Sequence, residues 1–159
     1  MRYPGDVYSF LEPRTSARKH EMTFQQDITI RTGGHRDMHD LTEQVDSVVS
    51  ASGIQAGIVT VFCIGSTCAV GTIEFEPGLC RDLPDTLDRL IPPSRGYGHE
   101  QAWHDGNGHS HLQATALGPS LTVPVAAGKL VLGDYQQIFQ LECDVRGRER
   151  TVVITVIGD

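Results

Sequence analysis

Two segments near the end of the chain decide the fold: residues 135–144, YQQIFQLECD, and residues 151–158, TVVITVIG. In the first segment Ile138, Gln140 and Glu142 share one face, and the residues between them share the other. A period of two is that of a β-strand, and the β-branched residues of the second segment favour a strand as well. We expect about three antiparallel strands in this C-terminal part of the chain.

Further strands are predicted on the N-terminal side of this pair. Residues 121–125 form one strand, residues 126–129 make a tight connection, and residues 130–132 continue on its far side. Residues 24–31 alternate weakly, and residues 54–64 are rich in Ile, Val and Phe, which is typical of a buried strand. We expect a largely antiparallel sheet whose exposed edges suit subunit pairing.

Three segments carry helical signals. Residues 41–52 lie between Asp40, a capping residue, and Gly53, a typical C-terminal stop. A second helix, residues 79–91, carries an apolar stripe. The stripe consists of Leu83, Leu87, Leu90 and Ile91. A third helix ends near Gly118. The chain is therefore predicted to be α+β, a largely antiparallel sheet or sandwich with about three helices.

Length and composition indicate one domain. A chain of 159 residues buries about two-thirds of its unfolded surface, so neither metal nor disulfides are required for folding. We place the domain at residues 23–159, after a polar N-terminal arm at residues 1–22. The four cysteines form no C-x-x-C pair and are expected to be reduced, with Cys63 and Cys143 buried in apolar runs.

Charge and hydropathy exclude two classes of partner. The formal net charge is −7, from 20 acidic and 13 basic side chains, and a phosphate backbone would repel it. No apolar run reaches the roughly 18 residues of a membrane span, and the first residues lack the layout of a signal peptide. We expect a cytoplasmic protein that binds neither nucleic acid nor membrane.

The chemistry concentrates in residues 96–118, GYGHEQAWHDGNGHSHLQATALG. This stretch holds the only tryptophan and four of the seven histidines: Trp103, His99, His104, His109 and His111. Histidine is the commonest metal ligand and the usual general acid or base near neutral pH. We therefore predict that the functional site lies here.

Whether these histidines share an ion depends on where the helix begins. If Asn107 caps a helix that ends at Gly118, residues advance by about 100° each. His109 then falls on the buried face, and His111 points nearly the opposite way, so the two cannot grip one ion. The other residues predicted for that buried face are Leu112, Ala116 and Leu117.

The alternative brings the imidazoles together. If residues 107–111 are extended, or if the helix begins near Ser110, His109 and His111 can approach one ion. His99, across the Asp-Gly turn, would complete a three-histidine site with an open position, for which zinc is the default ion. The competing interpretation leaves the imidazoles as acid–base or hydrogen-bonding groups without metal.

Three arginines recur at period two before the last strand: Arg146, Arg148 and Arg150. Guanidinium groups bind phosphate through two parallel hydrogen bonds, so these residues are candidates for holding an anionic substrate. The alternative is a solvated hairpin tip, which we favour for at least one of the three.

Other polar residues allow a functional and a structural interpretation. Glu74 and Glu76 alternate with apolar residues, so both carboxylates are predicted to face one side of a strand. His35 and His39 lie in a connecting turn, where we expect them to be solvated.

Residues 54–159 resemble the YjbQ-like family, often labelled secondary thiamine-phosphate synthase enzymes. The resemblance rests on IEFEPGL, on YGHEQAWHDGNGHSHLQATALGPSLTVPV, on LVLGDYQQI and on the closing Arg-x-Arg. It extends more weakly through DITI and SGIQAG. It implies a compact α+β subunit, usually a homotrimer with sites near subunit boundaries.

The resemblance also places functional positions on this chain. A histidine–asparagine–histidine motif, two acidic positions and a tryptophan–glutamine motif fall on His99, Asn107, His111, Glu74, Asp82, Tyr135 and Gln136. Many members carry a histidine and two threonines where this chain has Gly65, Ser66 and Thr67, so His109 is a candidate substitute for that histidine. The usual Thr-Trp is Asp134-Tyr135 here, which changes a stacking surface.

The resemblance implies an enzyme of thiamine-phosphate synthase type acting on phosphorylated small molecules. The expected roles are zinc or another divalent metal at His99, His109 and His111, proton transfer or ion binding at Glu74 or Asp82, and ligand binding at Asn107, Gln136 and Arg148. Two other functions fit the same residues: a metal- or metabolite-binding homotrimer without turnover, and a metal-dependent hydrolase.

Overall fold

The computed structural model describes residues 22–159. The predicted N-terminal arm lies outside this range, except for Met22, which begins a strand. The elements in chain order are β1 (Met22–Arg31), β2 (Met38–Asp40), α1 (Thr42–Ser52), β3 (Ala56–Cys63), β4 (Cys68–Ile73), α2 (Leu79–Leu90), the 3-10 helix η1 (Gly98–Gln101), α3 (Gly108–Leu117), β5 (Ser120–Ala126), β6 (Lys129–Leu130), β7 (Gln137–Glu142) and β8 (Glu149–Gly158).

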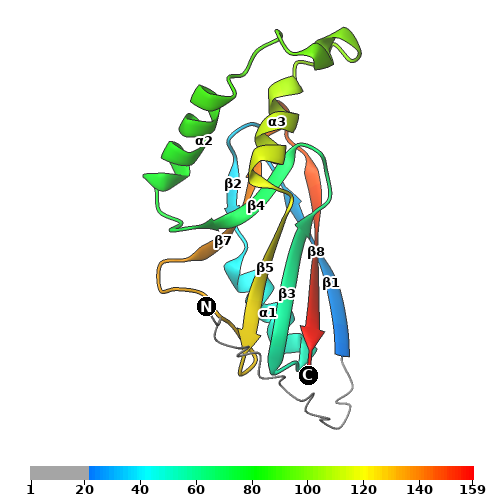
Figure 1. The fold of residues 1–159 in the computed structure, drawn as a ribbon, viewed down its shortest axis with the longest axis vertical. Helices are drawn as coiled ribbons and strands as arrows, with labels where there is room; N and C mark the ends of the chain where they lie inside the picture. Colours follow the sequence, from blue (N-terminus) through cyan, green and yellow to red (C-terminus); the bar gives the residue numbers. More distant parts are fainter. Residues whose placement is uncertain (1–21) are drawn as a thin grey trace, which may run out of the picture.

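The strands form two antiparallel sheets (Figure 1). The large sheet has the order β1-β8-β3-β5-β6, and the small sheet has the order β2-β7-β4. In the large sheet β8 lies between β1 and β3, with Ile28 opposite Val152 and Val59 opposite Val156. The two segments that decide the fold are thus the inner strand β8 of the large sheet and the central strand β7 of the small sheet. The predicted α+β class with three helices is confirmed.

The main core fills the space between the large sheet, α1 and one face of the small sheet. Alternate residues of β3 and β8, such as Val61 and Ile154, are fully buried there. Helix α1 contributes Val45 and Val49, and β7 contributes Ile138. Burying one such side chain contributes about 1.5–3 kcal/mol, so this layer is the main source of stability.

A second core covers the opposite face of the small sheet. Phe139, Leu141 and Cys143 pack there against Leu87 of α2 and Ala114 of α3. The predicted two faces of β7 are therefore correct, and both faces are buried. This second layer fixes the position of α3 above the small sheet (Figure 1).

The predicted details of α1 and α2 are confirmed in part. Gly53 ends α1 with a φ of 70°, and the Asp40 carboxylate accepts hydrogen bonds from the backbone and hydroxyl of Thr42. In α2, Leu87 is buried as predicted, but Leu90 is 73% exposed. The buried apolar face of α2 is therefore narrower than predicted, because Leu87 packs against the small sheet and Leu90 does not.

The predicted strand alternation of Glu74 and Glu76 is wrong. Strand β4 ends at Ile73, and the Glu76 carboxylate accepts hydrogen bonds from the backbone N–H groups of Gly78 and Leu79. These bonds hold the pKa of Glu76 below its ordinary value. Glu76 therefore stabilises the start of α2 in the manner of an N-terminal cap.

None of the helices within residues 22–159 has the length and apolar character needed to cross a membrane.

Candidate functional site

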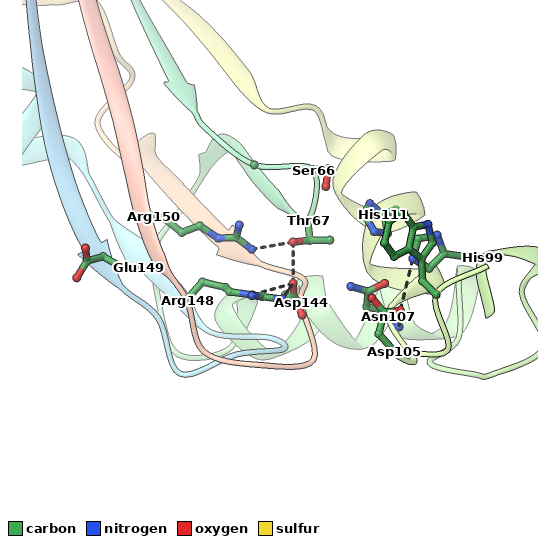
Figure 2. Close-up of a pocket in the computed structure, with 12 residues that line it drawn as sticks. Ser66, Thr67, His99, Asp105, Asn107, His111, Asp144, Arg148, Glu149 and Arg150 are labelled. Atoms are coloured by element: carbon green, nitrogen blue, oxygen red, sulfur yellow. Dashed lines mark hydrogen bonds and ion pairs between the residues drawn. The ribbon is translucent and has the colours of Figure 1, made fainter. Parts of the chain in front are cut away.

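A cavity of about 600 Å³ opens where three connecting segments meet. One wall is the loop of residues 65–67 between β3 and β4, and a second is the stretch of residues 99–111 around the start of α3. The third is the connection of residues 144–150 between β7 and β8. Figure 2 shows His99 and His111 on the α3 side and Arg148 and Arg150 on the β8 side.

A buried ion pair supports the β8 side of the cavity. Arg150 donates from Nε to Glu142 Oε2 at 2.7 Å and from Nη2 to Glu142 Oε1 at 2.5 Å. The side chains are 8% and 0% exposed. Thr32 Oγ1 also donates to Glu142 Oε2 at 2.9 Å. A two-pronged pair of this kind fixes the guanidinium plane, so Arg150 is held rigidly at the cavity wall.

A second pair extends this network to the surface. Arg150 Nη2 donates to Thr67 Oγ1 at 2.8 Å, and Thr67 Oγ1 donates to Asp144 Oδ2 at 3.0 Å. Arg148 contacts the same Asp144 oxygen through Nε at 3.0 Å and Nη2 at 2.9 Å. Burial raises the pKa of Asp144, but the hydrogen bonds from Thr67 and Arg148 lower it by more, so the pKa lies below its ordinary value. The network therefore joins two cations to two carboxylates and links the 65–67 loop to the connection of residues 144–150.

The opposite wall is made of imidazoles. The ring centroids of His99 and His111 are 4.7 Å apart. His99 Nε2 lies 3.4 Å from Asp105 Oδ1, and its ring stacks on Trp103 at 6.5 Å with an angle of 22°. Asp105 and Trp103 thus orient His99, whereas no hydrogen bond within residues 22–159 occupies the side chain of His111.

Asn107 lies between the two walls and carries an unsatisfied polar atom. The residue is 6% exposed, and its Oδ1 has no hydrogen-bond partner among the described residues. It precedes α3 without capping it through its side chain. Buried polar atoms usually have partners. Asn107 lines the cavity, so this buried oxygen is a candidate acceptor for a hydrogen bond from a ligand.

The structure does not assemble the predicted three-histidine metal site. Helix α3 begins at Gly108, so the helical alternative holds: His109 is 2% exposed, and its ring meets His35 edge-on at 5.2 Å. Burial lowers the pKa of His109 and favours the neutral ring. Residues 22–159 contain no group of three or more His, Cys, Asp or Glu side chains that could hold an ion.

The structure also corrects the roles of the turn histidine and of the α3 face. His35 is hydrogen-bonded instead of solvated, with Nε2 2.9 Å from Asp88 Oδ1 and Nδ1 3.2 Å from the Cys143 carbonyl oxygen. His39, also expected in a solvated turn, lies in β2 with Nε2 2.9 Å from Asp37 Oδ2. In α3, Leu112 was expected on the buried face but is 47% exposed, whereas Gln113 is buried. Ala116, also expected on the buried face, is exposed. The reason is that Gln113 donates to Asp88 Oδ1 and to the Ile91 carbonyl oxygen, each at 2.9 Å.

Three other predicted site residues lie away from the cavity. Glu74 and Asp82 are exposed, beyond the end of β4 and in the first turn of α2. Gln136 is exposed and donates from Nε2 to Thr72 Oγ1 at 3.1 Å. Of the predicted residues, the cavity brings together His99, His111, Asn107 and Arg148.

Gly65, where the resemblance led us to expect a histidine, has a clear structural role. Its φ is +146°, and a Cβ atom there would lie 2.5 Å from Nη1 of Arg150. The position therefore accommodates the guanidinium of Arg150 and leaves no room for a side chain without displacing it.

Sequence reasoning missed Glu142 and Asp144 as partners of the arginines. The signal was present, because the period of two that joins Gln140 to Glu142 continues to Asp144 beyond the end of β7. The alternating arginines follow within eight residues. Two acidic residues followed so closely by alternating arginines indicate ion pairing across the connection between β7 and β8.

Comparisons with known proteins agree with this architecture. Residues 26–159 match the family described as UPF0047 protein YjbQ-like. A UPF0047 protein from Methanothermobacter thermautotrophicus is 38% identical over 135 residues, covering 85% of this chain and 92% of that protein.

Two solved structures share the fold. A YbjQ-like protein of unknown function from Sulfolobus solfataricus superposes with a TM-score of 0.83 at 36% identity, covering 88% of this chain and 100% of the other. An uncharacterized conserved YjbQ/UPF0047 protein from Clostridium acetobutylicum gives 0.74 at 30% identity, covering 82% and 98%. With the resemblance confirmed along most of its length, this chain belongs to the YjbQ-like UPF0047 family.

Proposed function

We propose that the cavity binds a phosphorylated small molecule and serves a group transfer of the thiamine-phosphate synthase type. The observation that carries the proposal is the convergence of two imidazoles, an unpartnered buried amide oxygen and a guanidinium on one space of about 600 Å³. A volume of this size suits a small-molecule ligand.

Arg148 is the group that we assign to phosphate. Its side chain is 44% exposed although Nε and Nη2 both contact Asp144. A guanidinium has five N–H donors, so some remain for a phosphate oxygen. The first turn of α3 adds the partial positive charge of a helix N-terminus, which favours anions. Because Asp144 offsets much of the charge of Arg148, we expect weak binding of inorganic phosphate alone.

Asn107 supplies the second contact. Its buried Oδ1 would accept a hydrogen bond from an amino or hydroxyl group of the ligand. Satisfying a buried polar atom removes a cost of about 1–3 kcal/mol. A ligand with both a phosphate and a nearby donor should therefore bind more tightly than phosphate.

The proposed reaction uses these contacts to stabilise a leaving group. The ring nitrogen of a thiazole phosphate attacks the carbon of a pyrimidine diphosphate that bears the diphosphate. The C–N bond forms as the C–O bond breaks, and pyrophosphate leaves with the electron pair. A ring N–H of His111 would donate to a pyrophosphate oxygen, and Arg148 would stabilise the departing charge.

Product formation from both phosphorylated precursors tests this reaction. We expect one pyrophosphate per thiamine phosphate, with rates at least about tenfold lower in His111→Ala and Arg148→Met, a loss typical of removed acid–base or charge-stabilising groups. Arg146→Met is the matched control, because Arg146 does not line the cavity. Glu74→Gln and Asp82→Asn should also leave the rate unchanged.

Absence of product, under conditions where an authentic synthase works, would refute the proposed reaction. Release of inorganic phosphate from a single precursor would instead support the hydrolase alternative.

One observation favours a metabolite-binding protein without turnover as the second candidate. Arg148 and Arg150 are each paired with a carboxylate, so the cavity carries little net positive charge for stabilising a transition state. This candidate predicts thermal stabilisation by ligand and no consumption of it.

If the site holds a divalent metal, we propose His99 and His111 as its ligands and no longer His109. Zinc content per subunit, measured by mass spectrometry on protein without a histidine tag, tests this. We expect any bound zinc to fall in His99→Ala and His111→Ala but not in His109→Ala. A loss in His109→Ala would restore the three-histidine set.

We further propose that the protein is a homotrimer. Support comes from the outer face of the large sheet, where Ile58, Phe62 and Ile157 are 43%, 42% and 40% exposed on neighbouring strands. Adjacent exposed apolar side chains of this kind mark an interaction surface.

A further inference from the structure

Two cysteines that sequence spacing did not pair meet beneath the cavity. Cys63 ends β3 in the large sheet, and Cys68 begins β4 in the small sheet. Their Sγ atoms are 2.7 Å apart, and the residues are 0% and 1% exposed. A disulfide has an S–S distance of about 2.05 Å, so a bond needs a sulfur displacement of well under about 1 Å.

A small reagent can approach one of the two thiols. Cys68 lines a second cavity of about 140 Å³ between the 65–67 loop and α3, together with His111, Ala114 and Thr115. This volume is several times the roughly 30 Å³ that one water molecule occupies in the liquid. A molecule of the size of hydrogen peroxide therefore fits beside Cys68.

The surroundings make Cys68 the nucleophile of the pair. The hydrogen bond with Cys63 lowers the pKa of Cys68, and the Arg150 guanidinium acts in the same direction, against burial and Glu142. The pKa of Cys63 is raised, first by the same hydrogen bond and then by burial. The other two thiols are less reactive, because burial raises the pKa of Cys143 to about 12 and also raises that of Cys80. Thiolates are the reactive form.

We propose that Cys63 and Cys68 form a reversible disulfide when the protein meets a peroxide. The Cys68 thiolate attacks one peroxide oxygen, the O–O bond breaks, and the leaving hydroxide takes a proton to become water. The Cys63 sulfur then attacks the resulting sulfenic sulfur, and the S–O bond breaks to release a second water. Two electrons pass from the two thiols to the peroxide, and a dithiol reductant reverses the change.

The bond would join the two sheets directly under a wall of the cavity. It closes a ring that contains Gly65, Ser66 and Thr67, all of which line that cavity. Thr67 also bonds Arg150 and Asp144, so the cross-link would restrain the loop on which the ion-pair network depends.

Mass spectrometry of the full chain tests the proposal. No lysine or arginine lies between Arg36 and Arg81, so trypsin releases residues 37–81 as one peptide that holds Cys63, Cys68 and Cys80. The Cys80→Ser variant leaves two thiols in that peptide. Residue 80 is only half-buried, so the substitution should be tolerated. After peroxide, denaturation and alkylation, we expect the peptide to lose about 2 Da and take no alkyl group.

Cys143 is the internal control, and it should remain fully alkylated in the same sample. Dithiothreitol should restore two alkyl groups to the peptide. Two outcomes would overturn the proposal: both thiols still alkylated after peroxide, or oxygen added to Cys68 without a cross-link. The unsubstituted chain provides a second measurement, in which four free thiols should fall to two.

Discussion

Replacing Arg150 by methionine tests the buried network most severely. The substitution removes both bonds to Glu142, at 2.7 and 2.5 Å. It leaves a carboxylate that is 0% exposed and whose remaining partners within residues 22–159 are Thr32 and the Asp144 backbone N–H. Breaking a buried pair by removing one partner costs about 3–5 kcal/mol. With a urea slope of about 2 kcal/mol per M, a loss of about 4 kcal/mol lowers the unfolding midpoint by about 2 M.

Far-UV circular dichroism should follow the unfolding, because the single tryptophan, Trp103, is 71% exposed and reports poorly on the core. Arg146→Met is the control and should change stability by less than about 0.5 kcal/mol, since Arg146 is exposed. Adding Glu142→Gln to Arg150→Met should recover part of the loss, because it removes the uncompensated charge. A cost below about 1 kcal/mol, or no recovery in the double variant, would refute the reasoning.

Three further predictions concern strain, pH and assembly. Gly65→Ala should lower the free energy of unfolding, measured in urea, by about 1–3 kcal/mol, because of the positive φ and the collision with Arg150. Gly98→Ala is the control and should leave it unchanged, since a Cβ atom there meets no atom within 4 Å. Because the pKa of buried His109 lies below its ordinary 6.5, the unfolded chain binds more protons in acid than the folded chain does. The free energy of unfolding should therefore fall as the pH drops below 6.5. His109→Gln should flatten the dependence of the melting temperature on pH in that range, and an unchanged slope would contradict this. Phe62→Lys should convert the proposed trimer to monomer in light scattering, and a monomeric unsubstituted protein would exclude the trimer.

Local patterns predicted the elements of the fold well. The alternation around Gln140 identified β7 and its two faces, and the left-handed Gly53 marked the end of α1. That both faces of β7 are buried depends on α2 and α3 crossing the small sheet. Such a contact joins residues far apart in sequence, so periodicity alone cannot reveal it.

The sequence predicted the two histidines that line the cavity but not the residues around them. The density of imidazoles identified His99 and His111, but the direction of His109 depended on the first residue of α3, a boundary that sequence patterns fix poorly. Glu76 had the spacing of a strand residue, although it binds the start of α2. The contact of Cys63 with Cys68 arises because β3 and β4 belong to different sheets that meet at this point.

The central claim is that this cavity, and not the exposed region around Glu74, Asp82 and Gln136, binds a phosphorylated small molecule. The direct measurement is a ¹H–¹⁵N correlation spectrum of the full chain titrated with pyrophosphate. We predict saturable shifts at the amides of residues 65–67, 107–111 and 144–150, and smaller saturable shifts in Arg148→Met. Shifts centred on Glu74, Asp82 and Gln136, or no saturable shift at any residue, would contradict the account.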